Sequence, residues 1–320
     1  MGPTMSGGWK SCPKPPKKRR RTPYDEIVEL CNLPPEIKEL LPRRWERYGD
    51  VVILKLPKEL TSYEREVGRL YAEVLGANLV LVDEGGVRGL TRCPVVRVIY
   101  GEESEAFHKE NRLIYNFDPI RIMFSSGNID ERIYVAELLK RSGDRRWVVW
   151  DLFAGIGYFS LPAGREVKGG AVVSVEINPL AYYYLIKNLV FNEITDRTIP
   201  VLGDNSKVIV PGTADLTISG YFVEEGWEEH VARVCSLLKP EGGLILYHFL
   251  AKKKELESRL AMLLKKFSRA LLNRNLDVAE HRCRRVKSYA PLVYHYVLEV
   301  LARPTKGEKP SGEDWASLYK

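Results

Sequence analysis

The strongest constraint on the fold is an apolar strand that runs directly into a glycine turn. Residues 148–159 read VVWDLFAGIGYF, so the strand ends at Asp151 and is followed by Gly155 and Gly157. In doubly wound α/β sheets, ligands bind beyond the carboxyl ends of the strands, where glycine lets the backbone approach them closely. A G-x-G pair alone is a weak signal, but this one follows a strand and opens a helix. The segment therefore predicts a ligand site at the end of a parallel strand.

The pattern after residue 143 alternates strands with helices. Such alternation is typical of a parallel sheet with helices on both faces. We therefore expect the α/β fold class with a Rossmann-like sheet. Its strands are expected over residues 147–152, 170–176, 198–202, 216–219 and 243–250, followed by a final pair near 277–284 and 294–301.

A smaller mixed α/β domain is expected before this sheet, so that the two domains span residues 23–127 and 128–303. The second domain opens with a helix that Asn128 or Asp130 caps and that runs to Leu139. Residues 1–22 are predicted to form a disordered basic tail, and residues 304–320 a polar tail. In the first domain we expect short helices within 23–48, strands at 51–56, 79–83 and 95–100, a helix over 63–75, a turn at Gly85-Gly86 and two more strands within 111–125.

The composition favours an acidic partner and argues against several other classes. The net charge of +7 makes nucleic acid the first candidate partner. No apolar run reaches the ~20 residues that a membrane span needs, and no secretory signal is evident. The odd number of cysteines and their scatter predict neither a metal site nor disulfides, and fit the cytoplasm. They are Cys12, Cys31, Cys93, Cys235 and Cys283.

Acidic side chains follow the next two predicted strands. Glu176 ends the second strand, and Asp204-Asn205 follow the third. A carboxylate at the first place is suited to the two hydroxyls of a ribose, and Asp204 is suited to the amine of an adenine. The alternatives are that Glu176 only starts a helix and that Asp204 only forms a turn. Ser160 stands where a dinucleotide site usually has its third glycine, which favours S-adenosylmethionine over a pyrophosphate ligand.

These segments resemble class I S-adenosylmethionine-dependent enzymes. More narrowly, they resemble the family that holds the tRNA guanine-37 N1-methyltransferases and the wybutosine-synthesis aminocarboxypropyltransferases. The resemblance extends from about residue 51 to residue 303. It is carried by FSSGN at 124–128 with Glu131-Arg132, by 151–159, by EINP at 176–179, by Asp204-Asn205 and by KSYAP at 287–291.

Two departures separate the members of this family. The methyltransferases have a proline where this chain has Tyr158, and an Asn-Leu-Pro or Asn-Pro-Pro element where it has Ser219-Gly220-Tyr221. The resemblance therefore implies transfer of the aminocarboxypropyl group of S-adenosylmethionine to 4-demethylwyosine at position 37 of tRNA(Phe). The alternative is methyl transfer to guanine 37. The implied partner is the anticodon loop of tRNA(Phe), bound by a monomer without a metal.

The resemblance also implies roles for individual residues. Arg132 would bind the carboxylate of the methionine moiety through two hydrogen bonds, and Ser125 would bind the same end. The implied cofactor-binding set is Ser125, Arg132, Asp151, Phe153, Gly155, Gly157, Glu176, Ile177, Asp204 and Asn205. No general base stands out, and the candidates are Tyr158, Tyr221 and His248. For the RNA we expect contacts from Arg282, Arg284, Arg285 and Lys287.

Overall fold

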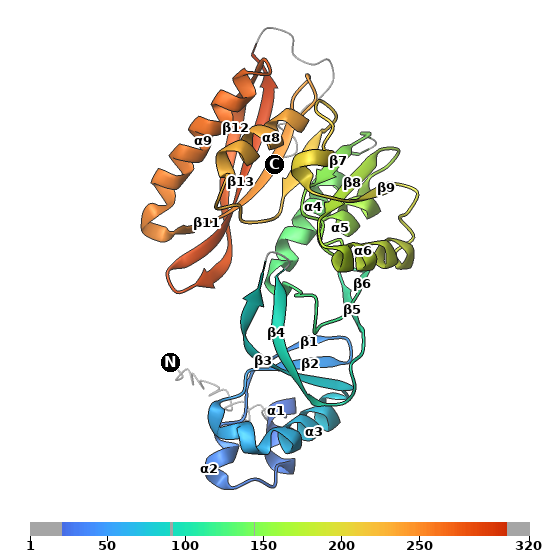
Figure 1. The fold of residues 1–320 in the computed structure, drawn as a ribbon, viewed down its shortest axis with the longest axis vertical. Coiled ribbons are helices and arrows are strands. Elements are labelled where there is room, and N and C mark those ends of the chain that lie inside the picture. Colours follow the sequence, from blue (N-terminus) through green and yellow to red (C-terminus); the bar gives the residue numbers. More distant parts are fainter. Residues whose placement is uncertain (1–20, 90–91, 144, 306–320) are drawn as a thin grey trace, which may run out of the picture.

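The fold consists of a small N-terminal body and a larger C-terminal body built on a seven-stranded sheet (Figure 1). The computed structural model describes residues 21–89, 92–143 and 145–305. The predictions for the two tails fall almost entirely outside these residues. The α/β class and the Rossmann-like sheet are confirmed, with the smaller body preceding the sheet.

The large sheet has the strand order β12-β13-β11-β10-β7-β8-β9. Strands β11, β10, β7, β8 and β9 run parallel, whereas β13 pairs antiparallel with β11 and β12. From β7 the chain passes to β8 and β9 on one side and returns to β10 on the other, which makes the carboxyl ends of β7 and β10 a topological switch point. The strands are β7 (Val148–Asp151), β8 (Ala171–Glu176), β9 (Thr198–Leu202), β10 (Leu216–Ser219), β11 (Gly243–Lys252), β12 (Leu276–Ala290) and β13 (Val293–Pro304).

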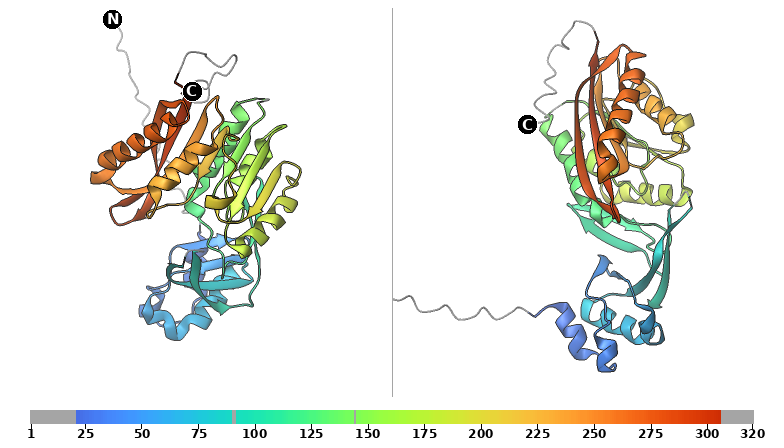
Figure 2. Two further views of the ribbon diagram at one scale, coloured as in Figure 1. Left: turned by 45° about the horizontal axis from the view of Figure 1, so that its top comes forward. Right: turned by 90° about the vertical axis from the view of Figure 1, so that its left-hand side faces the viewer.

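Helices cover both faces of this sheet (Figure 2). Helices α4 (Ile129–Arg141) and α5 (Ser160–Glu166) pack on one face, around Val149 and Ile218. Helices α8 (Trp227–Leu237) and α9 (Leu256–Leu272) pack on the other, around Trp150 and Tyr247. Because both faces are covered, the parallel strands are apolar almost throughout. Two further helices, α6 (Pro179–Phe191) and the short α7 (Asn205–Val208), follow β8 and β9.

The N-terminal body has a four-stranded sheet of order β1-β2-β3-β4. Helices α1 and α3 pack on it around Leu54, Val80 and Tyr71. Its elements are α1 (Pro23–Leu30), α2 (Pro35–Lys38), β1 (Trp45–Tyr48), β2 (Val51–Leu54), α3 (Glu64–Leu75), β3 (Leu79–Arg88) and β4 (Cys93–Tyr100), and a separate hairpin of β5 (Ala106–Glu110) and β6 (Leu113–Phe117) follows.

Three local predictions for this body were wrong. Residues Trp45–Tyr48 form a strand rather than part of a helix, because they pair antiparallel with β2. Strand β3 continues through Gly85-Gly86 with a shift of register between Asp83 and Val87, so these glycines do not end it. Only one of the two strands expected within 111–125 lies there, because its partner β5 begins at Ala106.

The hairpin joins the two bodies through asparagine side chains. Asn188 of α6 accepts from the backbone N–H of Asn116 at 2.7 Å and donates to its carbonyl oxygen at 3.1 Å. Asn192, one helical turn later, makes the same pair of bonds with Ile114 at 2.9 and 2.8 Å. These side chains take the place of a neighbouring strand for β6 and hold the hairpin against α6 of the C-terminal body.

Candidate functional site

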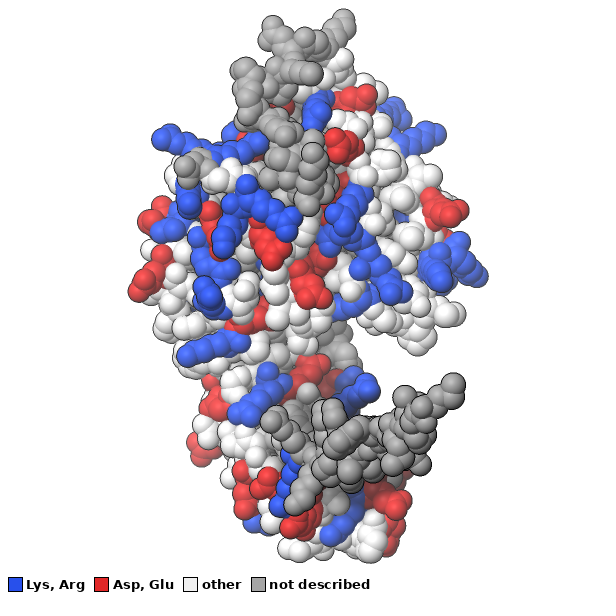
Figure 3. All heavy atoms as spheres, turned by 180° about the vertical axis from the view of Figure 1, so that it is seen from behind, with Lys and Arg blue, Asp and Glu red and all other residues white. Residues whose placement is uncertain are grey.

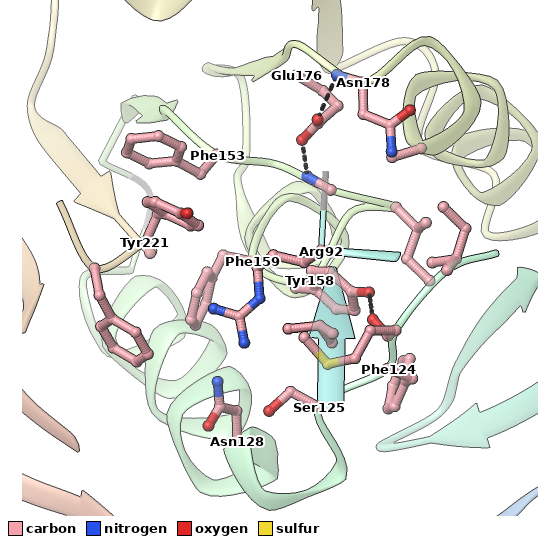
Figure 4. Close-up of a pocket in the computed structure, with 18 of the residues that line it drawn as sticks. Arg92, Phe124, Ser125, Asn128, Phe153, Tyr158, Phe159, Glu176, Asn178 and Tyr221 are labelled. Atoms are coloured by element: carbon pink, nitrogen blue, oxygen red, sulfur yellow. Dashed lines mark hydrogen bonds between the residues drawn. The ribbon is translucent and has the colours of Figure 1, made fainter. Parts of the chain in front are cut away.

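A pocket of about 1000 Å³ opens at the switch point between β7 and β10. Its wall is built by the ends of β7, β8, β9 and β10, by the loop before α4, and by residues of the N-terminal body (Figure 4). Eight of the ten residues predicted to bind a cofactor line it. These are Ser125, Arg132, Phe153, Gly155, Glu176, Ile177, Asp204 and Asn205.

The glycine turn has backbone angles that require glycine. Gly155 has φ +56° and Gly157 has φ +104°. A Cβ atom on Gly155 would lie 2.5 Å from the Tyr158 ring, and one on Gly157 would lie 2.8 Å from Cγ of Leu161. Gly157 does not line the pocket, and its positive φ shapes the turn that does.

The Glu176 carboxylate is held by two backbone hydrogen bonds. It accepts from the N–H of Gly155 and from the N–H of Asn178, each at 2.7 Å (Figure 4). Burial raises the pKa of Glu176, and these hydrogen bonds oppose the rise. The remaining lone pairs of the fixed carboxylate are available to the pocket, which suits it to accept from two neighbouring hydroxyls. Ile177 beside it is 60% exposed and gives the pocket an apolar wall.

Asp204 and Asn205 lie at the junction between the end of β9 and the start of α7. Asp204 caps this helix by accepting from the N–H of Ser206 at 2.8 Å, and that bond lowers the pKa of its carboxyl group. Asn205 donates to the carbonyl oxygen of Leu152 at 3.1 Å. Asp204 therefore forms the turn before α7, and it also lines the pocket.

Aromatic rings form a further part of the pocket wall. Phe153 stacks on Tyr221 with ring centres 5.2 Å apart and planes at 29°. Tyr158 also lines the pocket, but its hydroxyl donates to the carbonyl oxygen of Met123 at 2.5 Å, and burial raises its pKa above the ordinary range. This fixed, poorly acidic phenol is suited to shaping the pocket and not to accepting a proton.

Asp151 lies beneath the pocket and does not line it. It is fully buried and accepts from the hydroxyl of Ser160 at 2.7 Å and from the N–H of Phe153 at 3.4 Å. The carboxylate thereby fastens both ends of the glycine turn. Of the predicted cofactor-binding residues, Asp151 therefore lies beneath the pocket and holds the glycine turn from there.

Replacing Asp151 by asparagine is expected to flatten the pH dependence of stability. Burial raises the pKa of Asp151 to about 7, whereas an unfolded aspartate titrates near 4. Between these values the folded state holds more protons, so this group's contribution to stability, complete below about pH 4, is lost as the pH rises to about 7, by at most about 1.4 kcal/mol per pH unit. Urea unfolding of both proteins from about pH 4 to about pH 8 measures the difference.

The matched control is Asp196→Asn, because Asp196 is exposed and its pKa is lowered by Arg197, outside this pH range. It should leave the slope unchanged. A wild-type slope that survives in Asp151→Asn would contradict the buried-carboxylate explanation.

Arg132 forms an ion pair with a carboxylate of the protein itself. Its side chain is 1% exposed, and Nη2 lies 2.7 Å from Oε2 of Glu110, while Nε bonds the other oxygen. Nη1 donates to the carbonyl oxygen of Ser125 at 3.0 Å. The two-pronged bond expected for a methionine carboxylate is therefore made with Glu110, and Arg132 supports the 124–128 loop from behind.

His248 is buried away from the pocket. It shares a 2.8 Å hydrogen bond with His295, and its ring lies against Phe159. Burial lowers the pKa of His248 well below its ordinary value. Of the three candidates for a general base, only Tyr158 and Tyr221 reach the pocket wall.

The predicted basic stretch on β12 does not form one surface. Arg284 lies 2.6 Å from Glu131 and also pairs with Glu299, so its guanidinium group is already paired with two carboxylates of the fold. Lys287 turns into the pocket and donates to the hydroxyl of Ser125 at 2.8 Å. Arg282 and Arg285 remain exposed, the latter over the ring of Tyr294. Arg284 and Arg285 are successive strand residues and so point to opposite faces, and a shift of register lies between Arg285 and Lys287.

Pocket residues of the N-terminal body, above all Arg92, were not anticipated from the sequence. Arg92 reaches into the centre of the pocket (Figure 4), and no motif marks it in the sequence. Phe222 and Tyr289 also line the pocket. Within the described part of the chain, no group of three or more His, Cys, Asp or Glu side chains is placed to hold a metal ion. No helix there is both long and apolar enough to cross a membrane.

The sheet order, the glycine turn and the carboxylate at the end of β8 define a class I S-adenosylmethionine-dependent fold. Residues 106–278 match the TRM5/TYW2 methyltransferase domain, and residues 25–104 match the TYW2 N-terminal domain. The chain belongs to the TRM5/TYW2 family.

Named relatives and solved structures include both TYW2-type and Trm5-type proteins. The tRNA(Phe) (4-demethylwyosine(37)-C(7)) aminocarboxypropyltransferase of Pyrococcus horikoshii is 35% identical over 84% of this chain and 92% of its own length. The crystal structure of P. horikoshii TYW2 in complex with MeSAdo covers 88% of this chain and 100% of its own, with 31% identity and a TM-score of 0.75. Trm5b from Pyrococcus abyssi covers 89% and 82%, with 26% identity and a TM-score of 0.71.

Proposed function

We propose that this protein transfers the 3-amino-3-carboxypropyl group of S-adenosylmethionine to 4-demethylwyosine at position 37 of tRNA(Phe), releasing methylthioadenosine, in the biosynthesis of wybutosine derivatives. The named relative with 35% identity over most of both chains supports this activity. The observation that carries the choice against methyl transfer is the end of β10. There Ser219 is buried against His230 at 2.7 Å and Tyr221 stacks on Phe153, so no asparagine amide faces the pocket from this turn.

The donor would lie across the ends of β8 and β9. Glu176 would accept from the two ribose hydroxyls, and Asp204 would accept from the adenine amine. Ile177 and Phe153 would flank the adenosine, because both offer apolar surface to the pocket. The sulfonium would then lie near the glycine turn, with the aminocarboxypropyl chain directed toward Ser125.

The reaction is a displacement at the γ-carbon of that chain. A ring carbon of the base forms a C–C bond with the γ-carbon, the C–S bond breaks, and its electron pair leaves with neutral methylthioadenosine. The proton of the ring carbon then passes to water. The positive sulfur already activates the carbon, so the protein's contribution is to align donor and acceptor.

The acceptor would be the anticodon loop of tRNA(Phe), with the target base turned into the pocket. A monomer would suffice, because one chain supplies the whole pocket. We assign residues 23–127 and 128–303 to the two domains, the second holding the donor. The described cysteines are free, which supports a cytoplasmic location.

Labelled donors test this function directly. With tRNA(Phe) carrying 4-demethylwyosine, S-adenosylmethionine labelled in its carboxyl group should transfer the label to the tRNA. Donor labelled in its methyl group should leave the label in methylthioadenosine. The control substrate is the same tRNA with unmodified guanine at that position. Label from the methyl group on either tRNA, together with S-adenosylhomocysteine, would instead establish the methyltransferase alternative.

A further inference from the structure

We propose that Arg92 and Lys287 form a phosphate subsite, which holds a backbone phosphate of the RNA nucleotide whose base enters the pocket. The two residues come from the N-terminal body and from β12. Arg92 and the loop of Ser125, to which Lys287 is bonded, lie across the pocket from Glu176 (Figure 4). That the ligand is a tRNA nucleotide rests on the proposed function.

Neither of these two charges is balanced by an ion pair with a carboxylate of the described chain, although Glu46 also lines the pocket and opposes the lowering of the pKa of Lys287 by burial, Arg132 and Arg92. In contrast, Arg132 beside them is neutralised by Glu110. Nε of Arg92 is buried without a hydrogen-bond partner. Lys287 donates to the neutral hydroxyl of Ser125. Partly buried cations without a counter-ion are costly, so an anionic ligand would bind here with little competition from the protein.

The net charge of the donor argues for phosphate over the methionine carboxylate. S-adenosylmethionine has one carboxylate but two positive groups, the ammonium and the sulfonium, so two added cations repel the molecule as a whole. A nucleotide in an RNA chain has one negative charge and no positive one. The donor's aminocarboxypropyl chain would also reach the Ser125 side of the pocket, but two cations there suit the singly negative nucleotide better than the donor.

Aromatic side chains next to the two cations would receive the base. The Arg92 guanidinium lies 6.0 Å from the ring centre of Tyr221, and Phe222 meets the edge of Tyr289 at 5.4 Å. All three rings line the pocket. Single-stranded RNA is commonly bound by rings that stack on the base and cations that contact the phosphate.

Gly127 provides the space that Lys287 occupies. A Cβ atom at this position would lie 3.0 Å from Cδ and 3.1 Å from Nζ of the lysine. The ammonium group is thereby held at the pocket wall and not in bulk solvent. Figure 3 shows further Lys and Arg side chains spread over the rear face of the C-terminal body, where they would add to the attraction for a polyanion.

The test compares Lys287→Gln and Arg92→Gln of the full chain with two control variants that also remove one charge. The controls are Lys140→Gln at the far end of α4 and Arg69→Gln on α3, both exposed. Binding of tRNA(Phe) is measured over a range of salt concentrations, and binding of S-adenosylmethionine and of methylthioadenosine is measured separately. The two small ligands also report whether each variant is folded.

We expect each pocket variant to raise the Kd for tRNA about tenfold and to reduce the slope of log Kd against log salt by about 0.7. Both small-molecule affinities and all values for the controls should change by less than about twofold. An unchanged Kd for tRNA would overturn the proposal. So would weaker binding of S-adenosylmethionine with unchanged methylthioadenosine, since that pattern identifies a site for the donor carboxylate.

These measurements separate the subsite from the activity. Binding is measured without turnover, so the expected pattern in a protein that releases no methylthioadenosine would support the subsite and reject the proposed function. Release of methylthioadenosine by the wild-type protein, together with unchanged tRNA binding by the two variants, would support the proposed function and reject the subsite.

Discussion

Replacing Arg132 by alanine is expected to lower the free energy of unfolding by about 3–5 kcal/mol, as for other buried ion pairs from which one partner is removed. The side chains of Arg132 and Glu110 are 1% and 7% exposed. Burial alone would raise the pKa of Glu110, but the nearby His108 ring and the hydrogen bonds from Arg132 hold it below its ordinary value. Without the guanidinium, this carboxylate would stay buried with only His108 beside it, 3.7 Å away.

Urea unfolding followed by tryptophan fluorescence measures this loss. The control is the double substitution Arg132→Met with Glu110→Leu, which removes both charges and fills the space with apolar groups. It should recover much of the loss, because a pair of apolar residues often replaces a buried ion pair at little cost. A loss below about 1 kcal/mol in the alanine variant would mean that the pair does not stabilise the fold.

The same variant tests whether Arg132 also contacts the donor. If the guanidinium only supports the 124–128 loop, binding of S-adenosylmethionine and of methylthioadenosine should weaken together. Methylthioadenosine lacks the amino acid moiety. Selective loss of S-adenosylmethionine binding would therefore restore the carboxylate contact that the sequence predicted.

The parts of the fold that are encoded locally were predictable. Strands 198–202 and 216–219 agree with β9 and β10, because both are short runs rich in apolar and β-branched residues, although β10 is buried throughout and the edge strand β9 is partly exposed. Strand β1 reads WERY and is half exposed, so only its pairing with β2 makes it a strand. Asn188 and Asn192 look like ordinary polar positions of a helix, and their bonds to β6 depend on a hairpin more than 70 residues away.

The residues of the pocket were likewise predictable only where a local motif marks them. The glycine turn and Glu176 follow from short motifs, and the 2.7 Å bond between them joins two adjacent strands of the predicted sheet. In contrast, Lys287 meets Ser125 across 162 residues, and Arg284 meets Glu131 across 153. No local pattern indicates such partners. Of these two charged residues, Lys287 lines the pocket and Arg284 does not, and neither placement follows from the local sequence.

Replacing Glu176 by glutamine is expected to weaken the binding of S-adenosylmethionine about 10- to 100-fold, the range for losing charge-assisted hydrogen bonds. In the wild-type protein each carboxylate oxygen accepts from one backbone N–H, of Gly155 or Asn178. Glutamine has one oxygen and one NH2 group. Its NH2 group would therefore face a backbone donor, and one acceptor for the ribose would be lost. Isothermal titration measures the change.

The binding of S-adenosylmethionine should also depend on pH, because Glu176 titrates. Burial raises the pKa of Glu176, and a ribose hydroxyl donates best to the charged carboxylate. Wild-type affinity should therefore be complete above this raised pKa and fall as the pH drops through it. Because glutamine does not titrate, the Glu176→Gln variant should bind weakly at every pH, without that fall.

Asp204→Asn is the matched control. The backbone N–H of Ser206 lowers the pKa of Asp204, so Asp204 stays charged through the pH range in which Glu176 titrates. The control should weaken binding yet keep the wild-type fall at low pH, since Glu176 is still present. If the fall disappeared in Asp204→Asn and survived in Glu176→Gln, the titrating group would be elsewhere and Glu176 would not be the ribose acceptor.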